Sequence, residues 1–303
     1  MSAAAVQAER FDPELVRRLG RLDLIAQVVA DGVALGVHHS RRRGFSNEFS
    51  DFKPYVPGDD LRLLDWRLYA RTDRFYVKRF DAETNLEVML VLDATRSMAW
   101  RWDDRVSKLE YAANFLAAMA CIHLRQQDLV GLLTHDTGGR QMLPPRAQRV
   151  RLDEIFATLA ALRPGAEPVL GGLLGDLADG PRHRGLIVVC SDLEEDADSV
   201  ARGLGALAGR DDELVLFHLL DAAEEDLPFR NVTHLRDSET GELLAVDLAT
   251  LRREHAETVR TFRAQWRGEC ERGGVLYLPL HTGMDYVEAM YRYIDARAVQ
   301  RRG

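Results

Sequence analysis

The chain has 303 residues, of which 46% are hydrophobic and 29% are charged, with a formal net charge of −8. This size is enough for one large domain or two small ones, and the acidic balance argues against a dedicated nucleic-acid binder. The three cysteines are too widely spaced for a disulfide framework or a Cys-x-x-Cys metal site, which favours a reducing, cytoplasmic location. Because no apolar run has the length of a signal peptide or a membrane span, neither secretion nor membrane insertion is expected.

The first 85 residues lack a regular alternation of strands and helices. Apolar residues at spacings of three and four predict one amphipathic helix over 13–35, or two short helices around Gly20. Prolines and glycines between 36 and 74 indicate turns, and 75–80 alternates like a half-exposed strand. We expect residues 1–85 to form a separate N-terminal lobe.

From residue 86 onward, strands and helices alternate, which predicts an α/β domain over 86–298 with a doubly wound, mostly parallel sheet. Two alternating runs within about 228–247 predict an inserted β-hairpin. Strands are predicted at 86–92, 129–134, 185–191, 214–220 and 275–280, with a short edge strand near 141–143. Helices are predicted at 108–125, 150–162, about 195–208, 251–270 and about 285–295.

Carboxylates directly follow two of the predicted strands. If the strand order is the common 3-2-1-4-5-6, Asp93 and Asp192 face one crevice at the carboxyl edge of the sheet, where such folds bind ligands. Thr95 and Ser97 complete an Asp-x-Thr-x-Ser loop, and this set of oxygen donors suits Mg²⁺. The alternative is that Asp93 and Thr95 only cap the next segment.

Four segments carry a resemblance to known families. VLDATRSMAW (91–100) resembles the metal-ion-dependent adhesion loop, Asp-x-Ser-x-Ser, of von Willebrand factor A domains, and CSDLEED (190–196) resembles their later Asp-bearing loop. The stretch 48–80, with its YVPGDD motif, resembles the hallmark of the bacterial "domain of unknown function 58" family, and 236–247 is similar to that family's hairpin. Together the resemblance covers about 40–295.

The resemblance implies a non-enzymatic, chaperone-like interaction adaptor with a sheet of von Willebrand factor A type. Its expected partners are a MoxR-type AAA+ ATPase and that ATPase's client proteins. In the implied site, Asp93 and Asp192 hold Mg²⁺ mostly through water and Thr95 and Ser97 ligate it directly. An open coordination position would then accept a carboxylate from a partner.

One departure from the family pattern makes this adhesion site incomplete. The pattern adds a Thr from a middle loop, whereas 164–180 contains no hydroxyl and Pro168 stands about where the Thr is expected. Either water replaces the missing ligand or the affinity for metal is lost.

The acidic run after Asp192 has two interpretations. It provides favourable negative charge at a helix N-terminus, or it adds negative potential to the metal or partner site. The run consists of Glu194, Glu195, Asp196 and Asp198.

The N-terminal lobe offers another surface for the partner, with candidate residues Tyr55, Pro57, Asp59, Asp60, Asp65 and Trp66. Two other functions stay open as alternatives. Asp93 could be the nucleophile of a metal-dependent phosphohydrolase, although Thr95 stands where such enzymes need a second Asp. The basic lobe, with Arg41–Arg43 and nearby aromatics, could bind nucleic acid, although interleaved aspartates favour internal salt bridges.

Overall fold

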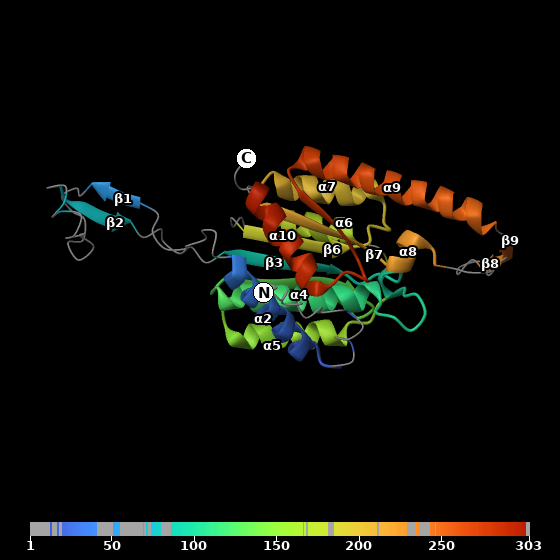
Figure 1. Cartoon of the computed structure of the whole chain (residues 1–303), viewed down its shortest axis with the longest axis horizontal. Coiled ribbons are helices and arrows are strands. Elements are labelled where there is room, and N and C mark those ends of the chain that lie inside the picture. Colours follow the sequence, from blue (N-terminus) through green and yellow to red (C-terminus); the bar gives the residue numbers. More distant parts are fainter. Residues whose placement is uncertain are drawn as a thin grey trace, which may run out of the picture. The chain divides into compact units, whose positions relative to one another are not determined.

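The computed structural model divides the chain into two compact units, residues 1–33 with 86–303 and residues 34–85. Figure 1 labels the elements along the chain. The structure describes residues 13, 17, 20–40, 51–54, 69, 71, 74–79, 86–165, 167, 169–180, 185–210, 212–228, 234–236, 243–245 and 247–300.

The N-terminal helix α2 (Leu22–Ser40) begins two residues after Gly20, whose φ of +65° is the left-handed conformation that glycine adopts without strain. Its buried stripe includes Ile25, Val29 and Val33. The Val33 carbonyl accepts a hydrogen bond of 3.0 Å from the Tyr291 hydroxyl. These contacts group residues 1–33 with 86–303, so the two units divide the chain differently from the predicted lobe over 1–85.

In the unit of residues 34–85, strand β1 (Asp51–Pro54) pairs antiparallel with β2 (Tyr76–Arg79). Strand β2 falls within the predicted strand at 75–80. The six candidate partner residues of this unit, Tyr55, Pro57, Asp59, Asp60, Asp65 and Trp66, lie outside the described residues.

A six-stranded sheet forms the centre of the larger unit, in the order β10-β7-β6-β3-β4-β5. Every neighbouring pair is parallel except β4 with β5. Counted along the chain, this is the order 3-2-1-4-5-6 with an antiparallel edge strand, which confirms the predicted fold class. The strands are β3 (Glu87–Asp93), β4 (Leu129–Asp136), β5 (Gly139–Arg146), β6 (Gly185–Ser191), β7 (Glu213–Leu220) and β10 (Leu276–His281).

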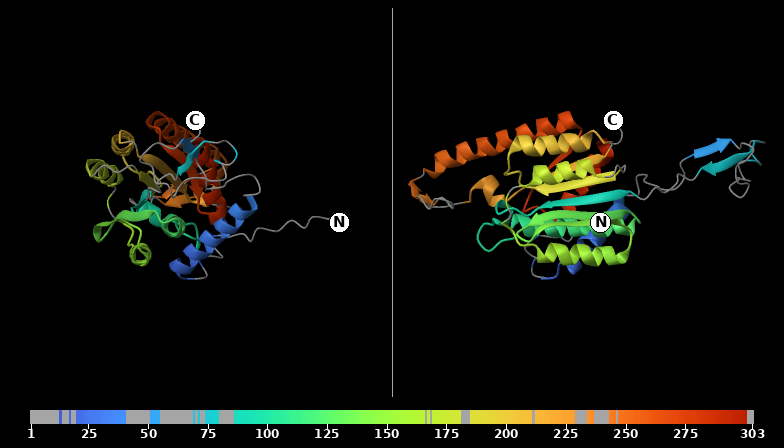
Figure 2. Two further views of the ribbon diagram at one scale, coloured as in Figure 1. Left: turned by 90° about the vertical axis from the view of Figure 1, so that its left-hand side faces the viewer. Right: turned by 180° about the vertical axis from the view of Figure 1, so that it is seen from behind.

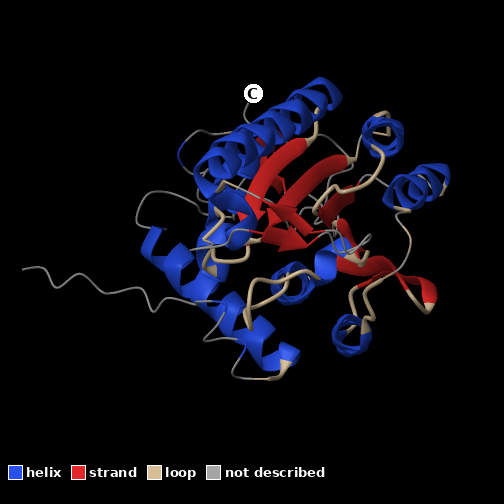
Figure 3. Ribbon diagram, turned by 90° about the vertical axis from the view of Figure 1, so that its right-hand side faces the viewer, coloured by secondary structure: helices blue, strands red, loops and turns tan. Residues whose placement is uncertain are grey.

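Helices cover both faces of this sheet, as Figure 3 shows in a view roughly along the strands. On one face, Phe115 of α4 contacts Phe217 of β7, which in turn contacts Tyr293 of α10. On the other face, α6, α7 and α9 bury a second apolar cluster that includes Trp266, and Figure 2 shows α7 and α9 together on that side. The helices are α4 (Lys108–Arg125), α5 (Arg149–Ala161), α6 (Leu170–Asp179), α7 (Ala197–Ala208), α9 (Leu248–Gly273) and α10 (Tyr286–Gln300), with the short η3 (Ser97–Ala99) and α8 (Ala222–Asp226).

The sequence pattern did not predict helix α6, which has ten residues. Three glycines within ten residues lower its helix propensity and make the segment resemble a turn. Packing explains two glycines at the α6–α7 contact: a Cβ on Gly171 would lie 2.7 Å from the backbone carbon of Ser199, and one on Gly203 would lie 2.8 Å from the Gly171 carbonyl. The close approach of the two helices therefore requires glycine.

The predicted hairpin is present: β8 (His234–Arg236) pairs antiparallel with β9 (Leu243–Ala245). Among the described residues, no helix is both long enough and apolar enough to cross a membrane.

Candidate functional site

The parallel register of β3 and β6 brings Asp93 and Ser191 together at the carboxyl edge of the sheet. Ser191 Oγ donates a hydrogen bond of 2.7 Å to Asp93 Oδ2, and the Thr95 backbone N–H donates one of 2.9 Å to Asp93 Oδ1. Burial raises the pKa of Asp93, and the negative charge of Asp192 raises it further. The side chain of Asp93 is thus held from both oxygens and is almost enclosed.

The two predicted hydroxyl ligands also meet. Thr95 Oγ1 lies 3.0 Å from Ser97 Oγ, and both side chains are half-buried. The Met98 backbone N–H donates to the Thr95 carbonyl, which fixes the turn that starts η3 at Ser97. Asp93 therefore shapes this loop through Thr95, but η3 has Arg96 at its N-cap and no side-chain capping hydrogen bond, so neither Asp93 nor Thr95 caps it. The same loop brings the two predicted hydroxyls together.

Asp192 lies beside a basic side chain that the sequence pattern does not indicate. Its side chain is completely buried, and Lys108 Nζ lies 2.8 Å from its Oδ2. Lys108, the first residue of α4, is itself completely buried. The same ammonium donates a hydrogen bond of 3.0 Å to Glu224 Oε1 and lies 3.6 Å from Glu194 Oε1.

This ammonium remains charged because its neighbours outweigh its burial. Burial alone lowers the pKa of Lys108, but the carboxylates of Asp192, Glu224 and Glu194 raise it, and the net effect is a pKa above the ordinary value. For Glu194, burial raises the pKa and the nearby Lys108 opposes that rise. A charged lysine among three carboxylates is thus the electrostatic centre of this edge.

Two capping boxes position the ends of this cluster. The Ser107 side chain accepts from the Glu110 backbone N–H, and Glu110 accepts from that of Ser107, which fixes where α4 and hence Lys108 begins. In α8, Glu224 Oε2 accepts from the Asp221 backbone N–H at 2.7 Å, so its other oxygen is free to face Lys108.

The acidic run after Asp192 divides between its two interpretations. Asp196 caps α7 by accepting from the Ser199 backbone N–H, and Asp198 lies in the first turn of that helix. Glu195 accepts from the first two backbone N–H groups of α6, at 2.7 and 3.2 Å. Only Glu194 joins the charge cluster around Lys108.

The predicted ligand set fits a divalent cation only in part. Adjacent ligands of an octahedral Mg²⁺ with ~2.1 Å bonds lie about 3.0 Å apart, which is the separation of the Thr95 and Ser97 hydroxyls. Asp192, however, already has the Lys108 ammonium 2.8 Å from its Oδ2, and each oxygen of Asp93 accepts one hydrogen bond within the protein. Asp192 therefore fits a divalent cation less well than the two hydroxyls do, and Pro168 lies outside the described residues.

Comparison with known proteins identifies the family. Residues 51–265, more than half of the chain, match the family described as "Protein of unknown function DUF58". The chain belongs to this family. It is 28% identical over 297 residues to the uncharacterized protein Rv1480 of Mycobacterium tuberculosis, an alignment that covers 96% of this chain and 92% of that protein.

Solved structures with a related arrangement include two from Bacteroides. The conserved hypothetical protein BatB of Bacteroides thetaiotaomicron is 16% identical, with a TM-score of 0.44, and the match covers 72% of this chain and 100% of that one. An aerotolerance-related membrane protein of Bacteroides fragilis is 18% identical, with a TM-score of 0.43, and the match covers 69% and 98% of the two chains.

Sequence reasoning missed two features of this DUF58 protein. The first is Lys108, whose only sequence signal is rarity: the 40 basic residues include just three lysines, at positions 53, 78 and 108. The second is Trp100, which is 38% exposed in the loop between β3 and α4 and has exposed Arg96 and Arg101 on either side. The signal that could have marked Trp100 is the polar and charged character of the loop around it, which includes Arg96 and Arg101.

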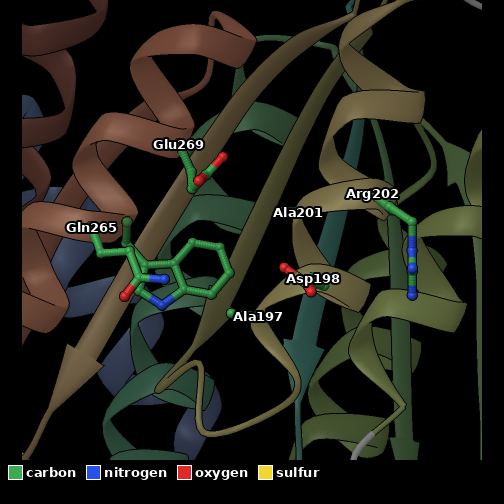
Figure 4. A pocket seen from close by; sticks show the side chains of 7 residues that line it. Ala197, Asp198, Ala201, Arg202, Gln265 and Glu269 are labelled. Carbon is green, nitrogen blue, oxygen red and sulfur yellow. The ribbon is translucent and has the colours of Figure 1, made fainter.

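A separate pocket of about 390 Å³ lies between α7 and α9 (Figure 4). Charged side chains of both signs line it, from Asp198, Arg202 and Glu269. Its lining also includes Trp266.

Proposed function

We propose that this DUF58 protein is a non-enzymatic interaction adaptor of the bacterial cytoplasm that acts with a MoxR-type AAA+ ATPase and its clients. The observation that carries the proposal is the loop of residues 94–107, here called the β3–α4 loop. It presents a large exposed Trp100 between Arg96 and Arg101. Tryptophan and arginine are the residues most enriched at the energetic centres of protein interfaces.

The support beneath this loop favours binding because hydrogen bonds hold it near both of its ends. Asp93 holds the backbone at Thr95, Thr95 contacts Ser97, and the Lys108 backbone N–H closes the loop on the Trp100 carbonyl at 3.4 Å. A loop that is ordered before association loses less conformational entropy when a partner binds. The β3–α4 loop therefore has the properties of a preorganised contact surface.

The same geometry speaks against the phosphohydrolase alternative. A nucleophilic Asp93 would need an oxygen that faces the substrate, but only 8% of the residue is exposed. Lys108 is completely buried and so does not reach a phosphate in solvent. These contacts support a binding role over a catalytic one.

The proposal is tested by a pull-down from native lysate with the tagged full chain. We expect an AAA+ ATPase to be recovered with the wild type and to be lost with Trp100→Ala. Val150→Ala is the matched control, because Val150 is also an exposed apolar residue, at 62%, and stands at the start of α5. Absence of an ATPase with folded wild-type protein would contradict the proposal. Turnover of a phosphoester that Asp93→Ala abolishes would favour the enzymatic alternative.

A further inference from the structure

One ammonium group joins three loops that are distant in the sequence. Lys108 is the first residue of α4, directly after the β3–α4 loop, Asp192 follows β6, and Glu224 lies in α8 after β7. The Nζ atom is 2.8 Å from Asp192 Oδ2 and 3.0 Å from Glu224 Oε1, with Glu194 Oε1 at 3.6 Å. These contacts place a full positive charge at the point where the strand order reverses.

Asp192 requires such a charge. Its side chain is completely removed from water, and a buried carboxylate without a counter-charge is strongly destabilising. A divalent ion held by Asp192 would share the carboxylate with an ammonium already 2.8 Å away. The repulsion between the two cations would therefore work against metal binding.

The choice of lysine over arginine fits this role. An ammonium is a compact charge with three donors, whereas a guanidinium is a planar fork suited to one carboxylate. Lys108 Nζ lies within 4 Å of three separate carboxylates, those of Asp192, Glu194 and Glu224. Only three of the 40 lysine and arginine residues of the chain are lysines, and one of these three is the completely buried Lys108.

We propose that the Lys108 ammonium is the built-in cation of this site and takes the place of a divalent metal at Asp192. The folded state then needs no Mg²⁺, and contact with a partner does not pass through a shared metal ligand. This inference concerns the charge balance of the site and does not depend on the identity of the partner.

The direct test is metal binding by the wild-type full chain. We expect added Mn²⁺ to produce no enhancement of water-proton relaxation beyond that of free Mn²⁺, and the melting temperature to be the same in EDTA and in Mg²⁺. A site with a Kd of ~1 mM would raise the melting temperature by roughly 3 °C or more at about 10 mM Mg²⁺. Such a rise, together with saturable Mn²⁺ binding that Asp192→Asn abolishes, would overturn the inference.

A variant tests the same point from the other side. Lys108→Ala removes the ammonium and opens space beside three carboxylates, so we expect a lower melting temperature that Mg²⁺ partly restores. Lys78→Ala, which removes a lysine of the other unit, is the control and should show neither effect. A Lys108→Ala protein that melts like the wild type would overturn the inference. If this variant does not fold, the Mn²⁺ measurement on the wild type still decides.

Discussion

Replacing Lys108 by Met should destabilise the protein by about 3 kcal/mol. Removing one partner of a buried ion pair costs ~3–5 kcal/mol, because the remaining charge is left uncompensated. Of the three carboxylates, only that of Asp192 is completely buried, whereas the Glu194 side chain is 53% exposed and that of Glu224 is 20% exposed. The two glutamates regain water when the ammonium is lost, so the cost comes mainly from Asp192 and lies at the lower end of the range.

Urea unfolding followed by far-UV circular dichroism measures this loss. We expect the Lys108→Met and Asp192→Asn changes to be non-additive, since the double variant no longer leaves a buried charge without a partner. Lys108→Arg is the matched control, because it keeps the charge but replaces three separate donors by a planar fork. Its loss should be smaller than that of Lys108→Met.

A loss below about 1 kcal/mol in Lys108→Met would refute this reasoning, because exposed pairs typically contribute that little. Additive losses in the double variant would refute it as well. Either result would mean that Asp192 gains its stability from a group other than Lys108.

Three further predictions concern other parts of the fold. Gly203→Ala should lower the free energy of unfolding by ~1–3 kcal/mol, because the added Cβ would lie 2.7–2.8 Å from atoms of α6. Gly205→Ala in the same helix has open space and should raise the free energy of unfolding by about 0.5–1 kcal/mol. Equal effects of the two variants in urea unfolding would contradict this prediction. Glu195→Ala should cost ~1 kcal/mol and speed amide exchange at the start of α6, since two N–H groups lose their acceptor; unchanged exchange there would argue against this cap. Burial, aided by the positive charge of Arg263, lowers the pKa of His218 to about 3 from 6.5. Between these two pH values the unfolded chain binds a proton at His218 that the native state does not bind. The free energy of unfolding therefore falls as the pH drops below about 6.5. His218→Gln should reduce the slope of the free energy of unfolding against pH by up to ~1.4 kcal/mol per pH unit. Equal slopes for the wild type and the variant, measured by urea unfolding at about pH 4.5–6, would refute this prediction.

Periodicity predicted most of the sheet because β3, β4, β6 and β7 are buried almost throughout their length. The apolar runs that form β3 and β6 each lead directly into the site, with Asp93 ending β3 and Asp192 following β6. Their adjacency followed from the strand order alone. Helix α6 was not predicted because its glycine at position 171 is required by close packing against α7, and this contact between distant residues leaves no pattern in the local sequence.

The candidate site was less predictable because its partners are distant in the sequence. Lysine is among the residues least often buried, so Lys108 at a helix start is expected to face solvent. Its burial depends on Asp192 and Glu224, which are more than 80 residues away along the chain. The hydrogen bond from Ser191 to Asp93 also joins residues that are distant in the sequence, and only the register of the sheet brings them together.

The proposed function requires that a partner binds the β3–α4 loop. The most direct measurement is the affinity of the purified MoxR-type ATPase from the same organism for the wild type, for Trp100→Ala and for Val150→Ala. We expect Trp100→Ala to raise the Kd by about 30-fold, corresponding to ~2 kcal/mol for a residue at an interface centre, and Val150→Ala to leave it unchanged. Equal affinity of the wild type and Trp100→Ala, or no binding by the wild type, would contradict a role of this loop in binding the ATPase.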